Sequence, residues 1–173
     1  MTKKKKIWLI VLTVIVVGFL IHEGFKMPVK GAHRGDYNPQ SFWYNWGGRP
    51  HLGIDVFAKK GTPIHSPTWC GLAFRLPKSG KGGNSIVMLG PKWRFHYFSH
   101  LDEISIGAVA IVGHGTKIGT VGSTGNAAGK PAHLHYSIVS MIPYPWRIDR
   151  AQRGYLKMFY LDPTPKLDRS VGK

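Results

Sequence analysis

Short β-prone runs separated by turn residues most constrain what this chain can fold into. After Phe42 these runs are bounded by Gly, Pro or Ser, and no stretch of twelve residues shows helical periodicity with caps. They lie at Ile54–Phe57, Ile86–Leu89, Phe95–Phe98, Ala108–Val112, Lys117–Val121 and Leu134–Val139. The 22 glycines and 12 prolines supply turns between them. A chain of 173 residues has room for one domain with a core, and we expect that domain to be mainly β.

The chain is strongly basic. Lys and Arg total 24 against 8 Asp and Glu, and the formal net charge of +16 implies attraction to an extended polyanion such as nucleic acid, anionic lipid or anionic cell wall. Neither a zinc-finger spacing nor an RNP-like aromatic sequence is visible, so we predict no nucleic-acid partner. The single cysteine, Cys70, excludes an intramolecular disulfide and a metal site built from several thiolates. The sequence does not indicate an oligomeric state.

The N-terminal segment has the pattern of an export signal or a membrane anchor. Lys3–Lys6 precede an apolar run, Ile7–Ile21, whose 15 residues are fewer than the ~20 that usually span a bilayer. No A-x-A cleavage site follows, so we favour an uncleaved transmembrane helix over a signal peptide. The positive-inside rule then places residues 1–6 in the cytoplasm as a basic tail, residues 7–22 in the inner (cytoplasmic) membrane as a single-pass anchor, and the remainder in the periplasm.

The exported part divides by composition into three segments. Residues 23–41 are polar and without period, which predicts a tether. Aromatic density rises sharply from Phe42, where the working domain, residues 42–140, is expected to begin. The tail, residues 141–173, mixes prolines, bases and aromatics; it is expected to pack on the domain, although its composition also suits the lining of a groove for a polymeric substrate.

The placement of certain histidines suggests metal chemistry. His133 and His135 are two apart in a β-prone run, so both side chains point to one face, ~6.6 Å apart along the strand. His51 and Asp55 are four apart, and Gly53 between them permits a bend that brings their side chains together. Two nitrogens and one carboxylate leave a fourth tetrahedral position open, as in a catalytic zinc site. Each motif alone is also compatible with ordinary strand residues.

Three segments together resemble the lysostaphin/LytM-type metallopeptidases. "RPHLGID", "YFSHLD" and "GSTGNAAGKPAHLHYSI" occur in the order and at the approximate spacing of that family, across residues 46–139. The resemblance implies a single compact antiparallel β-sheet domain with an active-site groove. It also implies that Zn²⁺ is held by His51, Asp55 and His135, with His100 and His133 as the catalytic pair.

The resemblance is not complete around two tyrosines. Phe98 stands where the family usually has a tyrosine two residues before the middle histidine, although Tyr97 is adjacent. Some relatives use a tyrosine upstream of the first zinc ligand, and Tyr44 is the candidate for that role here.

The function implied by the resemblance is a zinc-dependent endopeptidase that hydrolyses peptide cross-links of bacterial peptidoglycan with a zinc-activated water. One alternative is a non-catalytic cell-wall-binding regulator of other wall hydrolases, and another is a basic protein that binds nucleic acid. Gly122, Gly125 and Gly129, together with the aromatic residues 42–46, suggest mobile loops beside an open cleft. The short anchor and tether would keep the site near a membrane, which suits an envelope with a thin wall close by, so we expect cross-links between stem peptides, rather than glycine bridges, to be the substrate.

Overall fold

The computed structural model describes residues 1–45, 47–78 and 80–171. Trp46, which belongs to the predicted aromatic cluster, lies outside the described residues. The strands are β1 (Ile54–Phe57), β2 (Pro63–His65), β3 (Gly71–Arg75), β4 (Asn84–Gly90), β5 (Arg94–Leu101), β6 (Val109–Val112), β7 (Lys117–Thr120), β8 (His133–Ser140) and β9 (Tyr160–Leu161). The α-helices are α1 (Lys3–Leu20) and α2 (Thr164–Val171). Short 3₁₀ helices lie at Arg34–Asp36, Pro39–Ser41, Pro91–Trp93, Gly125–Ala127, Pro145–Arg147 and Gly154–Met158.

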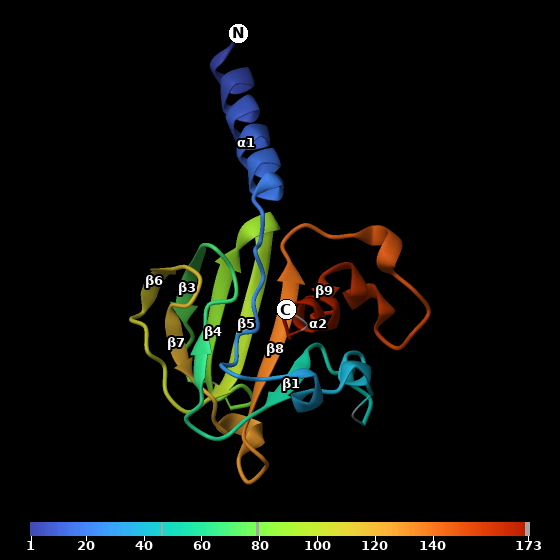
Figure 1. Cartoon of the computed structure of the whole chain (residues 1–173). Coiled ribbons are helices and arrows are strands. Elements are labelled where there is room, and N and C mark those ends of the chain that lie inside the picture. The colour runs from blue at the N-terminus through green and yellow to red at the C-terminus, as the bar shows by residue number, and fades with distance from the viewer. Residues whose placement is uncertain (46, 79, 172–173) are drawn as a thin grey trace.

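One large antiparallel sheet dominates the fold, which confirms the prediction of a compact, mainly β domain. Its strand order is β1-β8-β5-β4-β3-β6, β9 pairs with β8, and β2 and β7 form a separate two-stranded sheet (Figure 1). All six runs predicted from the sequence contain or overlap a strand. The strands β2, β3 and β9 were not predicted.

Alternation of side chains gives the large sheet a core face and an opposite face. Ile54, Tyr136, Phe98 and Ile86 follow one another across neighbouring strands and are fully buried on the core face. The residues between them along the strands face the other way. Asp55 on β1 and Ser99 on β5 are both register partners of His135 on β8, which sets a row of polar side chains on the opposite face.

The predicted tether is instead part of the core packing. Within residues 23–41, Val29 is fully buried and bridges to Ile64, and Tyr37, 4% exposed, bridges to Val56. The segment runs across the large sheet and packs on it, whereas a polar linker would stay in solvent (Figure 1). A few apolar side chains in a polar stretch are enough to dock it, and they show no period that a sequence pattern would reveal. The C-terminal segment also joins this core, through Leu161 of β9 and Leu167 of α2.

Helix α1 forms over the predicted N-terminal apolar run, and its first four residues are lysines. In the part of the chain that the structure describes, no helix is long and apolar enough to cross a membrane. The structure therefore does not support the predicted transmembrane helix.

A buried ion cluster joins both ends of the chain to the sheet. The carboxylate of Glu23, 6% exposed, accepts a hydrogen bond of 2.5 Å from Arg94 on β5 and a second from Lys166 on α2. Burial alone raises the pKa of Glu23, but the hydrogen bonds and charges of Lys166 and Arg94 outweigh it and hold this pKa below its usual value. The carboxylate is thus ionised and lies between two half-buried cations, and its single negative charge balances one of the two positive charges.

We expect Glu23→Ala to destabilise the fold by about 3–5 kcal/mol, because it leaves two buried cations without their counter-charge. Urea unfolding of the full chain measures this loss. Since the folded-state pKa of Glu23 is lowered, the stabilisation is complete above the unfolded-state value of 4.5 and is lost as the pH falls below it. The difference in the free energy of unfolding between wild type and Glu23→Ala should therefore become smaller in acid. The exposed Glu103→Ala is the control, and an equal effect there would contradict the cluster's role.

Candidate metal centre

Strand register brings two of the three predicted ligands together. Asp55 on β1 is the direct register partner of His135 on β8, so their side chains are neighbours on the face opposite the core. His51 lies just before β1, and its backbone N–H donates to the Tyr44 carbonyl at 2.7 Å. Gly53 lets this segment approach β8, because a Cβ there would lie 2.8 Å from the His135 ring and 2.6 Å from the Tyr136 carbonyl oxygen.

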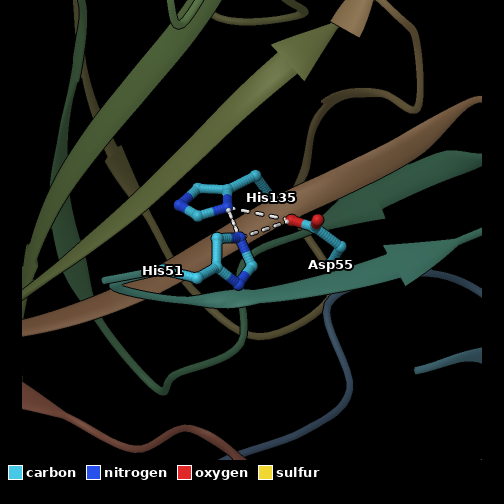
Figure 2. Close-up of side chains that lie close together, drawn as sticks. All are labelled: His51, Asp55 and His135. Carbon is cyan, nitrogen blue, oxygen red and sulfur yellow. Dashed lines mark hydrogen bonds and ion pairs between the residues drawn. The ribbon is translucent and has the colours of Figure 1, made fainter. Parts of the chain in front are cut away.

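The side-chain atoms of these three residues converge on one point (Figure 2). His135 Nδ1 lies 2.9 Å from Asp55 Oδ1 and 2.9 Å from His51 Nε2, and His51 Nε2 lies 3.2 Å from Asp55 Oδ1. Ligand atoms of a tetrahedral zinc with bonds of ~2.0–2.1 Å lie roughly 3.3 Å apart. The two imidazoles and the carboxylate therefore fit zinc in atom type and in spacing, and they leave the fourth position free.

The outward-facing nitrogens of both histidines are held by neighbours. His51 Nδ1 lies 3.1 Å from the Ser41 carbonyl oxygen, which can only accept, so Nδ1 carries a proton and Nε2 is the nitrogen that would bind a metal once it has lost the proton that it shares with Asp55. His135 Nε2 lies 3.1 Å from the Ser137 hydroxyl. Bonds of this kind fix the ring orientation and the tautomer of a metal-binding histidine.

Electrostatics favours a charged carboxylate at this point. Burial raises the pKa of Asp55, but hydrogen bonds from His135 and His51 outweigh it and hold that pKa far below its usual value. For His51, burial lowers the pKa, and the hydrogen bond to Asp55 and the charge of Asp55 together raise it above normal. For His135, burial prevails and the pKa is lowered, which favours the neutral, ligating form of the ring.

His100 and His133, the predicted catalytic pair, lie beside the three converging residues. The ring of His100 lies 5.0 Å from that of His133 and 6.0 Å from that of His135, between centroids. His133 Nε2 is 3.9 Å from Asp55 Oδ2. His100 Nδ1 donates to the Thr124 carbonyl at 2.9 Å and His133 Nδ1 to the Pro131 carbonyl at 2.8 Å, so each neutral ring has its lone pair on Nε2.

The backbone at His100 is in the left-handed region, with φ at 64° at the end of β5. Residues other than glycine rarely adopt this conformation, and it is held here by a hydrogen bond from the His100 N–H to the Gly82 carbonyl at 2.9 Å. Burial lowers the pKa of His100 to about 4, so the ring is neutral at neutral pH. The Nδ1 hydrogen bond to the Thr124 carbonyl fixes the ring and the N–H bond to Gly82 fixes the backbone, so the neutral Nε2 is held in place beside the three converging residues.

All five residues line a groove of about 690 Å³. The active-site groove that the family resemblance implies is therefore present. Sequence reasoning missed several of its lining residues: Phe57, Lys81, Ser99, Asn126 and Lys130. Tyr97 lines the groove, with its ring 6.4 Å from that of His135, whereas Phe98 is buried in the core. Tyr44, the predicted upstream tyrosine, is 56% exposed and is not among the lining residues; its carbonyl holds His51.

Glycines before β8 allow close packing of two loops rather than the predicted loop mobility. A Cβ at Gly122 would meet the Asp102 nitrogen at 2.3 Å, and one at Gly125, where φ is +67°, would meet the Lys81 carbonyl oxygen at 2.4 Å. Only Gly129 has open space around it among these glycines. The close contacts fix the wall of the groove next to His100 and His133.

An antiparallel sheet that carries two histidines and an aspartate at zinc spacing, in an open groove, defines a metallopeptidase-type domain. The chain belongs to peptidase family M23, whose model matches residues 49–143. It is 36% identical over 140 residues to the L-Ala--D-Glu endopeptidase of Bacillus subtilis, covering 70% of this chain and 41% of that protein. It is 33% identical over 100 residues to the DD-carboxypeptidase/endopeptidase Mpg of Neisseria meningitidis, covering 58% of this chain and 22% of that protein. The chain thus spans less than half the length of these relatives.

Solved structures share the fold. A zinc-containing peptidase from Vibrio cholerae is 28% identical with a TM-score of 0.55, covering 69% of this chain and 37% of that one. The catalytic domain of lysostaphin from Staphylococcus simulans is 22% identical with a TM-score of 0.53, covering 83% and 88% of the two chains. The predicted resemblance to lysostaphin-type peptidases is confirmed at the level of family and fold. The individual roles of His51, Asp55, His135, His100 and His133 stay predictions.

Proposed function

We propose that this protein is a zinc-dependent endopeptidase that hydrolyses peptide cross-links of bacterial peptidoglycan. The observation that carries the proposal is the convergence of His51 Nε2, Asp55 Oδ1 and His135 Nδ1, each within 4.8 Å of the others, in an open groove. Membership of a peptidase family and similarity to relatives named as endopeptidases support it. A zinc ion bound by these three residues would polarise the scissile carbonyl and activate a water molecule near neutral pH.

His100 and His133 supply the proton transfers that hydrolysis needs. With both Nδ1 protons directed to backbone carbonyls, each neutral ring offers its Nε2 as a proton acceptor. One ring accepts a proton from the attacking water and later returns it to the departing amine nitrogen, so that no net proton is gained or lost. The protonated ring also stabilises negative charge that develops on the carbonyl oxygen.

The five filled positions argue against a non-catalytic wall-binding regulator. A regulator needs no metal-binding atoms at zinc spacing, nor two further histidines whose outer nitrogens are both fixed. The substrate we propose is the cross-link between stem peptides.

Digestion of defined substrates tests this function. The full chain, loaded with zinc, is incubated with cross-linked muropeptide dimers and separately with pentaglycine, and the products are analysed by mass. We expect monomers from the dimers and no cleavage of pentaglycine. Cleavage of pentaglycine alone would overturn the proposed substrate, and binding to cell wall with no hydrolysis of either compound would favour the regulator.

We also propose that the protein works outside the cytoplasm, at the inner membrane. The apolar side chains of α1 support this, since Trp8 is 72% exposed and Leu20 76% exposed, with the lysines at the opposite end from the domain (Figure 1). Fractionation of cells followed by N-terminal sequencing tests it. An intact chain in the membrane fraction is the expected result, and a soluble form that starts after the apolar run would contradict it.

A further inference from the structure

Two lysines line the groove without a role in the proposed hydrolysis. Lys81 precedes β4 and Lys130 precedes β8, and both are exposed side chains on the groove wall. Among the residues that the structure describes, neither lysine forms an ion pair. Of the described residues that line the groove, only Asp55 is acidic, and its carboxylate is already paired with histidines. The groove therefore presents two uncompensated positive charges to a substrate.

The lysines stand on loops that are fixed to each other. The Asn126 N–H donates to the Lys81 carbonyl at 3.0 Å, and the Lys130 N–H donates to the Ala127 carbonyl at 3.0 Å. Gly83 and Gly125 both have positive φ and pack backbone to backbone, since a Cβ at Gly83 would lie 2.5 Å from the Gly125 nitrogen. The two charges are therefore carried by one connected wall, and not by independent surface loops.

This wall is the same one that holds the two proton-transferring histidines. Gly82, next to Lys81, accepts the backbone N–H of His100 at 2.9 Å. Pro131, next to Lys130, accepts the Nδ1 proton of His133 at 2.8 Å. Each lysine is thus one residue away from an anchor of the catalytic pair, on the His100 and His133 side of the groove.

We propose that Lys81 and Lys130 bind a free carboxylate of the substrate peptide close to the scissile amide. This inference rests on the proposed endopeptidase function and names a feature that its substrate must have. A carboxylate is the anionic group that a peptide substrate carries, and the apolar side chains of Phe57, Ala127 and Pro131 in the same lining reduce the competition from water. Stem peptides with free carboxylates meet the requirement, and a neutral glycine bridge does not.

The test pairs two substrates with a set of charge-removing variants. The substrates are a cross-linked muropeptide dimer with free carboxylates and the same dimer with its carboxylates converted to amides. The variants are Lys81→Met, Lys130→Met and the double substitution, made in the full chain, which retain the apolar stem and remove the charge. Lys78→Met is the matched control, because Lys78 belongs to the same loop as Lys81 and does not line the groove.

We expect each single variant to lower kcat/KM for the free-carboxylate dimer by roughly 3- to 10-fold, mainly through KM, and the double variant by more, the scale of a partly solvated charge pair. The same variants should change kcat/KM for the amidated dimer by less than about 2-fold, because removing an exposed charge that has no charged partner has little effect on binding. Rising salt should raise KM for the wild type and the control, and much less for the double variant.

The outcomes separate this inference from the function on which it rests. If wild type hydrolyses neither dimer, the proposed endopeptidase function is wrong. If wild type hydrolyses both dimers equally well and the lysine variants match Lys78→Met, the function stands and the carboxylate site is overturned. Equal loss on both dimers would mean that the lysines hold the groove wall and do not recognise the carboxylate, which also overturns it.

Discussion

Replacing His135 by alanine should reduce bound zinc from about one ion per chain to nearly none and lower hydrolysis by at least ~10³-fold. His135 Nδ1 is the atom closest to both partners, at 2.9 Å from Asp55 Oδ1 and 2.9 Å from His51 Nε2, so its loss leaves only two ligands. The loss of activity follows because metal polarisation of a carbonyl is worth several kcal/mol. Elemental analysis of protein purified without chelator measures the zinc, and peptide release from muropeptide dimers measures the activity.

The control for this prediction is His65→Ala, a half-buried histidine on β2 outside the groove, which should keep its zinc. Circular dichroism should show that the His135 variant stays folded. The core is formed by apolar residues on the other face of the sheet, such as Ile54 and Tyr136, and does not depend on the metal. A His135 variant with full metal content would contradict the ligand assignment. Zinc-free wild type that is active would contradict the metal's part in the reaction.

The sequence predicts the strands better than it predicts the convergence of the candidate site residues. The H-x-H spacing of His133 and His135 fixes a common face by strand geometry alone. That His135 stands opposite Asp55 depends on the register of β1 against β8, two segments about 80 residues apart, which the pattern of neither strand determines. The family resemblance supplied this pairing, and the structure gives its physical basis.

Other features of the site and the fold depend on tertiary contacts that the sequence pattern does not reveal. His100 reaches the groove because φ is +64° at the end of β5, which breaks the alternation that would otherwise send its side chain to the core face. The docked segment that contains Val29 and Tyr37 looks polar in sequence, because a small number of buried side chains holds it. Lys81 belongs to the loop before β4, and it is brought to the groove by the close contact of Gly83 with Gly125 and by the hydrogen bond from the Asn126 N–H to its carbonyl.

Replacing either His100 or His133 should leave zinc in place and lower hydrolysis by at least ~10²-fold, the scale of a positioned acid–base group. Neither residue belongs to the three whose metal-binding atoms converge, so the metal content should match that of wild type. His133→Ala tests one ring. At position 100 an alanine would also lose conformational stability at φ +64°, so His100→Asn is the better variant, since asparagine tolerates the left-handed region and removes the imidazole.

The matched control is Asn126→Ala, an exposed residue that lines the same wall and donates only its backbone N–H to Lys81. It should keep both zinc and hydrolysis near the wild-type level. The rate effects should fall on kcat, because a proton-transferring group acts in the transition state and not in substrate binding. Loss of zinc from His133→Ala or His100→Asn would mean that the ring is a ligand. Unchanged kcat in both variants would remove the two histidines from the reaction and leave the three converging residues as the whole of the catalytic site.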